Sequence, residues 1–234
     1  MPKVSSNQSS RRAGQRSDAG RSRVRPEGAK RAEILAAATE RFGRDGYEHT
    51  KWADIARDVG VGPTALYHYF ESKQHCLHVI LLEAIEDFQA RFASATTATA
   101  DPVASIVAVT RAFFQLSEHE VLRNRVLVAE QGLLGVRRSS SREEDARRAA
   151  RARARQLEFA WASFLAGAMR AGAVPDGDPR LLSRALLGLY NSIWQWYRPD
   201  GIHGLRSIAD FFHGRALAMI GIAPEGITRT RMVA

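Results

Sequence analysis

The stretch TKWADIARDVGVGPTALYHYFESK, residues 50–73, decides the fold of this chain. Apolar residues recur at helical spacing in its first half, which predicts a short helix with one buried face. The residues of that face are Trp52, Ile55, Ala56 and Val59. Just before the helix, Thr50 carries a hydroxyl that can accept a hydrogen bond from a free amide of the first turn, so we expect it to be the N-cap.

A glycine turn follows this helix. Gly60 can adopt the positive φ that a sharp helix end needs, and Gly62 relaxes the next corner. Pro63 suits the first turn of a second helix, where its missing N–H costs nothing. Ser72 can cap a third helix, which leaves the second about two turns long.

The second short helix carries a polar and aromatic outer face formed by Thr64, Tyr67 and His68. Two short helices with such a face are typical of a helix-turn-helix, in which the second helix lies in the DNA major groove. The alternative is an ordinary helical corner with aromatic residues on its surface.

The segment from about Lys30 to Leu77 resembles the N-terminal DNA-binding domain of the TetR family of transcriptional regulators. The matching stretches are ILAAATERFGRDGYEHT at 34–50, DIARDVGVGPTALYHYF at 54–70 and the trailing ESK, in the right order and without a gap. They cover roughly a fifth of the chain. The resemblance implies a helix before the motif, a long connecting helix after it and a helical domain for ligand binding and dimerisation.

The resemblance also implies where DNA is contacted. The expected contact residues are Thr50, Lys51, Gly62, Pro63, Thr64, Tyr67, His68, Tyr69 and Lys73. Those from Thr64 to Tyr69 would read or flank bases, whereas Thr50, Lys51 and Lys73 would hold phosphates. The family often has hydroxyl residues where Lys51 and Gly62 stand. Lys51 could still neutralise a phosphate, but Gly62 offers only its backbone N–H.

Composition agrees with a nucleic-acid partner. The 234 residues are enough for one large or two small domains, and the formal net charge of +9 favours an anionic partner. The single cysteine, Cys76, fits a reducing compartment. Because the chain has neither an apolar run long enough to span a bilayer nor the apolar core of a signal peptide, we expect a cytoplasmic protein.

The chain divides into four expected regions. Residues 1–28 form a disordered basic arm with seven basic and two acidic side chains, which either follows DNA phosphates or is only a solubilising tail. Residues 29–75 form the DNA-binding domain, with the helix-turn-helix at about 52–71. Residues 76–221 form the ligand-binding and dimerisation domain, and residues 222–234 form a tail.

Apolar residues repeat every three or four positions along most of the chain, and no segment alternates like a strand for long, so the fold class is all-α. Expected helices cover about 30–45, 72–95, 102–117, 120–134, 143–171, 179–197 and 205–220, with Asp178 and Pro179 starting the sixth. Arginines gather where the fifth begins, and we interpret them as an exposed, solvated face; holding the phosphates of an anionic ligand is the competing use. They are Arg137, Arg138, Arg142, Arg147, Arg148, Arg151, Arg153 and Arg155.

The last two helices each carry an apolar stripe. In TetR-like proteins these two helices pair with those of a second subunit as a four-helix bundle, so the resemblance implies a homodimer, which matches a palindromic DNA site. The expected interface residues are Leu182, Leu186, Leu189, Ile193, Ile208, Phe211, Phe212 and Met219.

The stretch NSIWQWYRPDG, residues 191–201, resembles a segment of the acyl-CoA-responsive branch of the family, which regulates fatty-acid and sterol-ring catabolism. An apolar pocket with an arginine near its entrance would suit an acyl or ring system joined to an anionic carrier. The alternative is that these aromatic residues belong to the core or an interface. The candidate ligand-binding residues are Phe113, Phe114, Phe159, Trp161, Phe164, Tyr190, Trp194, Tyr197 and Arg198.

The sequence therefore predicts a homodimeric repressor that a small molecule, an acyl-CoA thioester as first candidate, releases from a palindromic operator. We expect no enzyme, cofactor or metal site, because the seven histidines are scattered and no nucleophile or phosphate-cradling motif is present. The alternatives are a repressor that senses hydrophobic drugs, as efflux regulators do, and a basic architectural DNA binder without an effector.

Overall fold

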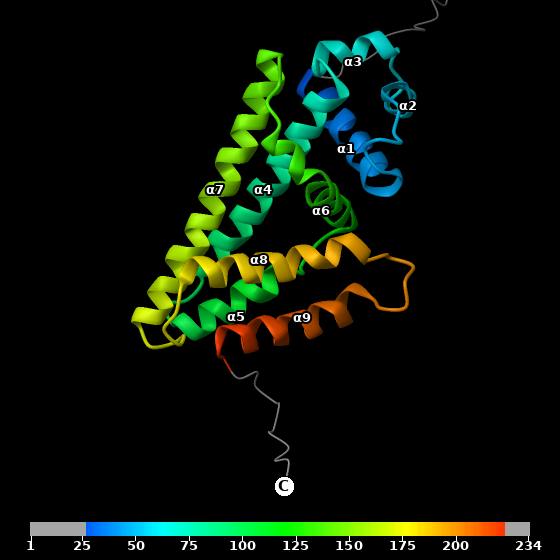
Figure 1. Ribbon diagram of the computed structural model, residues 1–234. Helices are drawn as coiled ribbons and strands as arrows, with labels where there is room; N and C mark the ends of the chain where they lie inside the picture. Colours follow the sequence, from blue (N-terminus) through cyan, green and yellow to red (C-terminus); the bar gives the residue numbers. More distant parts are fainter. Residues whose placement is uncertain (1–26, 223–234) are drawn as a thin grey trace, which may run out of the picture.

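The computed structural model describes residues 27–222, and this part of the chain is entirely helical, as expected (Figure 1). Its helices are α1 Glu27–Asp45, α2 Trp52–Asp58, α3 Pro63–Tyr69, α4 Lys73–Thr97, α5 Pro102–Ala112, α6 Glu118–Glu130, the 3-10 helix η1 Gln131–Gly135, α7 Ser141–Arg170, α8 Pro179–Trp196 and α9 Leu205–Ile220. The expected basic arm and C-terminal tail lie almost wholly outside the described residues. The expected arm is two residues too long, because α1 already begins at Glu27.

The N-terminal unit consists of α1, α2, α3 and the first turn of α4, and it lies at one end of the molecule (Figure 1). One residue from each of its first three helices is fully buried in a common core: Ile34, Ile55 and Leu66. Phe42 and Tyr47 close that core with an edge-to-face ring contact at 5.1 Å. The helix-turn-helix thus has its own hydrophobic support.

The remaining helices form the helical body. The long helices α4 and α7 pack side by side, and α5, α8 and α9 lie across their far ends (Figure 1). Helix α6 lies between the N-terminal unit and α8, and it packs against α1. That contact is close, since a Cβ added to Gly43 of α1 would lie 2.9 Å from Leu122 Cβ of α6.

Two of the three side-chain caps expected from the sequence are confirmed. Ser72 accepts a hydrogen bond from His75 N at the start of α4, and Asp178 accepts from Arg180 N and Leu181 N at the start of α8. The expectation for Thr50 is wrong. Lys51 is the N-cap of α2 without a side-chain bond, and the Thr50 hydroxyl instead donates to the Gly46 carbonyl at 2.8 Å.

Two helix boundaries differ from expectation around one capping box. Ser117 accepts from Glu120 N while the Glu120 carboxylate accepts from Ser117 N, so α6 begins at Glu118. Helix α5 ends at Ala112, before this capping box. The last part of the expected helix 120–134 is not α-helical, because α6 ends at Glu130 and the 3-10 helix η1 follows it.

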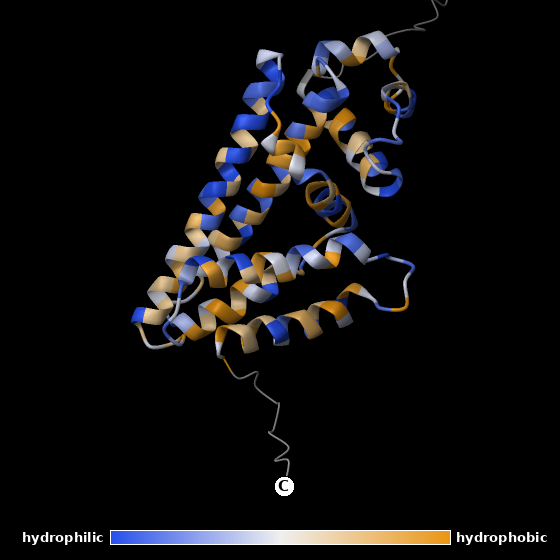
Figure 2. Ribbon diagram, viewed as in Figure 1, coloured by the Kyte–Doolittle hydropathy of each residue, from blue (hydrophilic) through white to orange (hydrophobic). Residues whose placement is uncertain are grey.

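The first half of α7 is mainly hydrophilic, whereas its second half carries apolar residues (Figure 2). Most of its arginines are exposed or half-buried, in agreement with a solvated face. Arg147 does not belong to this solvated face. It is 4% exposed, it forms two 2.7 Å bonds to the Glu144 carboxylate, and it donates to the Leu134 carbonyl at 2.6 Å.

Candidate DNA-binding and ligand-binding sites

Helix α3 presents a small surface at the outer end of the molecule (Figure 1). Leu66 anchors it in the core, while Thr64 and His68 are exposed and Tyr67 is 53% exposed. Tyr69 is half-buried and packs against the core. Lys51, Gly62 and Pro63 are also exposed, so most of the expected DNA-contact residues lie on the surface.

The ammonium group of Lys73, which we expected to bind a DNA phosphate, is bonded within the protein. Its ammonium donates to the Tyr47 carbonyl at 2.7 Å and to the Thr50 carbonyl at 3.0 Å, and it lies 4.1 Å from the centre of the Tyr47 ring. Two of its three N–H donors are therefore used inside the N-terminal unit. Thr50 is 4% exposed with its hydroxyl bonded, which argues against a phosphate contact by its side chain.

Other cations hold the helix-turn-helix together. Lys30 of α1 donates to the Val59 carbonyl at 3.0 Å, which satisfies the end of α2. The Arg31 guanidinium lies 4.9 Å from the centre of the Phe70 ring, just after α3. The sequence shows these cations as basic residues near the motif, but their role as internal supports appears only in the fold.

The start of α7 is bonded to the corner between α3 and α4. Ser140 donates to the Glu71 carboxylate, and Ser72 donates to the Glu143 carboxylate. The corner that follows α3 is therefore tied directly to the start of α7.

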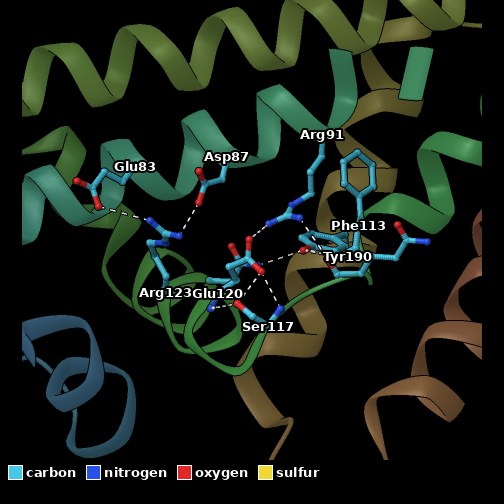
Figure 3. A network of polar contacts seen from close by, with 10 residues as sticks. Glu83, Asp87, Arg91, Phe113, Ser117, Glu120, Arg123 and Tyr190 are labelled. Atoms are coloured by element: carbon cyan, nitrogen blue, oxygen red, sulfur yellow. Dashed lines mark hydrogen bonds and ion pairs between the residues drawn. The ribbon is translucent and has the colours of Figure 1, made fainter. Parts of the chain in front are cut away.

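Figure 3 shows how α6 is fastened to α4. The Arg123 guanidinium bonds Asp87 at 2.6 Å and Glu83 at 3.4 Å. Arg91 of α4 bonds Glu120, the residue of the capping box. A displacement of α6 therefore has to strain or break ion pairs with α4.

The helical body contains an apolar cavity of about 220 Å³ between α4, α6, η1, α7 and α8. Its lining residues are Ile85, Phe88, Asn124, Leu127, Val128, Gln131, Leu134, Ala154, Leu157, Glu158, Leu187, Tyr190, Asn191 and Trp194. Asn124 Nδ2 donates to the Tyr190 hydroxyl at 3.2 Å, and that hydroxyl donates to the Phe113 carbonyl at 2.9 Å. Such a cavity, mostly apolar with a few fixed polar groups, suits a small organic molecule.

The rings of Phe88 and Tyr190 also line a much smaller apolar space on the other side, together with Phe113, Phe114 and Trp161. Phe88 and Phe113 stack with ring centres 4.1 Å apart. Of the residues expected to bind ligand, Tyr190 and Trp194 therefore line the larger of these two spaces, whereas Phe113, Phe114 and Trp161 line the smaller but not the larger.

The other expected ligand residues lie elsewhere. Phe159 is 70% exposed and lines neither apolar space. Phe164 packs on Phe92 and Trp161 behind the cavity, Tyr197 is buried against the Trp194 ring, and Arg198 is exposed. Sequence reasoning missed Asn124, although a polar residue within the apolar stripe of a helix was a usable signal.

The expected dimer residues divide into two groups. Leu186, Ile193 and Ile208 are at most 5% exposed and belong to the chain's own core, so their assignment to an interface is wrong. Phe211 and Met219 are exposed, and Leu182, Leu189 and Phe212 are half-buried. Helix α8 also exposes Leu181 and Trp196, which the sequence analysis did not include among the interface residues.

These observations define a helix-turn-helix unit joined to a helical body that holds a small-molecule cavity. Within residues 27–222, no helix is long and apolar enough to cross a bilayer. This is the architecture of a ligand-responsive, DNA-binding regulator.

Comparison with known families identifies that regulator. Residues 34–80 match the family of bacterial regulatory proteins described as the tetR family, and residues 99–220 match the tetracyclin repressor-like C-terminal domain. The chain belongs to the TetR family of transcriptional regulators.

One known repressor is similar to this chain over most of the length of both proteins. The HTH-type transcriptional repressor KstR2 of Mycobacterium tuberculosis is 26% identical over 199 residues, which are 85% of this chain and 95% of that protein. The structure of this ketosteroid transcriptional regulator superposes with a TM-score of 0.66 at 25% identity, over 84% of this chain and 96% of that one.

Two further structures share the fold. PfmR from Thermus thermophilus, a TetR family regulator, has a TM-score of 0.65 at 27% identity, over 82% of this chain and 98% of that one. AibR, solved in complex with isovaleryl coenzyme A and operator DNA, has a TM-score of 0.66 at 23% identity, over 80% of this chain and 97% of that one.

Proposed function

We propose that this regulator is a homodimeric cytoplasmic repressor without catalytic activity, and that an acyl-CoA thioester releases it from a palindromic operator. The observation that carries this proposal is the cavity beside α6, the helix that packs directly on α1 of the DNA-binding unit. The isovaleryl-CoA complex of AibR supports the choice of effector class, and the name of the KstR2 repressor supports the direction of regulation.

The proposed DNA surface is the exposed face of α3 with its flanking turn. Thr64, Tyr67 and His68 would contact bases, since their side chains project from a helix anchored by Leu66. Lys51 and the backbone N–H of Gly62 would contact phosphates. Tyr69, which is half-buried, would contribute only its outer edge.

The proposed dimer surface is the outer apolar face of α8 and α9. It contains Leu181, Trp196, Phe211 and Met219, which are between 43% and 63% exposed. Gly188 of α8 has no neighbour within 4 Å of an added Cβ, so a second helix has room to approach closely there. A monomer would leave this surface in water, and a twofold dimer would bury it.

Ligand binding would act through α6. Asn124, Leu127 and Val128 of α6 line the cavity, and Leu122 on the same helix contacts Gly43 of α1. A ligand that favours a shifted α6 therefore favours a shifted N-terminal unit. In a dimer, this changes the spacing of the two α3 helices and lowers DNA affinity.

The first experiment selects a binding site from random duplex DNA and then measures release by fluorescence anisotropy. Isovaleryl-CoA, octanoyl-CoA and a polycyclic acyl-CoA are compared with hydrophobic cationic drugs. We expect at least one thioester to release the protein from DNA. Release by the drugs alone would indicate an efflux-type regulator, and tight DNA binding that no compound affects would indicate an architectural protein.

The Tyr67→Ala variant tests the reading helix. We expect it to weaken operator binding by about tenfold or more, because one good base contact contributes ~1–3 kcal/mol. Its melting temperature should not change, since the side chain is largely exposed. Phe159→Ala removes another exposed aromatic residue and should leave DNA binding intact. An unchanged affinity in Tyr67→Ala would contradict the assignment.

A further inference from the structure

An open cleft of about 410 Å³ lies where the N-terminal unit meets the helical body. The end of α1 forms one wall, from Phe42 to Gly46, and α6 and the end of α8 form the other. Figure 1 shows α6 between α1 and this end of α8. An occupant of the cleft would therefore touch both halves of the molecule.

The cleft adjoins the ligand cavity. Val128 of α6 and Trp194 of α8 line both spaces, so these two side chains form the partition between them. A single elongated molecule could occupy both spaces only by passing along this partition. The cavity side is mainly apolar, whereas the cleft side includes the charged residues Arg44, Asp45 and Arg125.

Arg125 of the cleft lining, and Arg198, which follows the lining residue Gln195 by three positions, have no acidic partner among residues 27–222. Arg125 lines it and is half-buried, without a salt bridge in the described part of the chain. Arg198 is exposed, and its guanidinium donates to the Tyr197 carbonyl at 3.1 Å. Burial and the nearby positive charge of Arg198 lower the pKa of Arg125.

The other charged residues of the cleft are already neutralised. Arg44 pairs with Glu40 and with Glu118 at 3.2 Å, and Asp45 lies 3.7 Å from Arg41. The unbalanced charge is therefore that of Arg125 and Arg198. The positive charge of Arg198 disfavours the charged form of Arg125, and a bound phosphate would offset this cost with charge-assisted hydrogen bonds.

We propose that Arg125 and Arg198 form a phosphate-binding subsite in this cleft. The proposal rests on the proposed function in one respect: the phosphates would belong to the coenzyme part of a thioester whose acyl group occupies the neighbouring cavity. Because α1 lines the cleft, phosphate binding would act directly on the position of the N-terminal unit.

The test measures binding of coenzyme A and of pantetheine, its phosphate-free fragment, by titration calorimetry. Variants are Arg125→Gln, Arg198→Gln and the double variant. Arg170→Gln, which removes an exposed arginine at the end of α7, is the matched control. We expect the double variant to bind coenzyme A about tenfold more weakly or worse, with pantetheine binding and melting temperature unchanged.

Further probes separate this subsite from the effector class. Equal binding of octanoyl-CoA by wild type and double variant would overturn the subsite and leave the proposed function standing. If no thioester binds, adenosine 3′,5′-bisphosphate serves as the probe, and Arg125-dependent binding of it would support the subsite alone. Failure of the wild type to bind coenzyme A, the bisphosphate and inorganic phosphate would overturn the subsite.

Discussion

Gly43 is the residue through which the two halves of the molecule come closest. A Cβ at this position would lie 2.9 Å from Leu122 Cβ and 3.1 Å from the Leu122 carbonyl oxygen. Because the carbonyl belongs to the backbone of α6, it cannot move aside alone. The glycine thus sets the distance between α1 and α6.

We expect Gly43→Ala to lower the free energy of unfolding by about 1–3 kcal/mol, despite the better helix propensity of alanine. Urea unfolding gives this quantity. Gly167→Ala is the control, since its Cβ would meet only the Arg170 side chain at an ordinary 3.9 Å, and it should be neutral or slightly stabilising. Equal stability of Gly43→Ala and wild type would show that the α1–α6 contact is not tight.

His78 is fully buried in α4, and neither ring nitrogen has a hydrogen-bond partner in the described part of the chain. Burial, followed by the positive charges of Arg138 and Arg147, lowers the pKa of His78 to about 4. The unfolded chain has the higher pKa, so it binds more protons as the pH falls. The contribution of His78 to stability is complete above about pH 6.5 and is lost as the pH falls towards 4.

We expect stability to fall by an amount on the order of 3 kcal/mol across this window on account of His78. His78→Leu should flatten the pH dependence without loss of stability at pH 7.5, because no hydrogen bond is removed. His75 and His213, whose pKa values are also lowered, leave a residual slope. Thermal melts between pH 4 and 7.5 measure the effect, with exposed His203→Asn as control. An unchanged slope in His78→Leu would contradict it.

At the scale of elements, the first half of α7 connects the corner between α3 and α4 with η1. Its start bonds the corner between α3 and α4 through Ser140 and Glu143, and one turn later Arg147 bonds Glu144 and the Leu134 carbonyl of η1. The hydrogen bonds from Arg147 hold the pKa of Glu144 well below its usual range. This ion pair therefore joins α7 to η1 and to the loop at Arg138.

Glu144→Gln should therefore destabilise the protein clearly, because it leaves the Arg147 charge buried without a counter-charge. Asp145→Asn, at the next position on the exposed side of α7, is the control and should have little effect. Melting temperatures of the two variants measure the difference. If both variants melt like the wild type, the buried ion pair is not structurally important.

At the scale of the whole molecule, the exposed phenylalanines Phe211 and Phe159 offer a matched pair. Phe211 lies on the proposed dimer face and is 58% exposed in the single chain, and Phe159 lies on α7 and is 70% exposed. Phe211→Asp should weaken dimerisation by about 2 kcal/mol or more, roughly thirtyfold, as for a central interface residue. Phe159→Asp should not, and light scattering over a dilution series distinguishes them. Equal dimerisation of the two variants would place the interface elsewhere.

The sequence predicted some residues well and others poorly, for one physical reason. Ser72 and Asp178 start helices as expected because capping is a local interaction. In α8, by contrast, apolar residues occur around much of the helix, so periodicity cannot separate Ile193 in the chain's own core from Trp196 on its outer face. Phe159 and Trp161 illustrate the same limit on α7, where one is exposed and the other buried.

Short-range chemistry was enough to establish the helical class, the helix-turn-helix and the helix caps at Ser72 and Asp178. These depend on spacing, caps and glycine or proline, and neighbouring residues determine all of them. The tertiary structure alone decided that Lys73 supports the Tyr47 turn, that Asn124 lines the cavity and that Arg125 lines a cleft with the end of α1. Those relations join residues distant along the chain, and only the packing of whole helices brings them together.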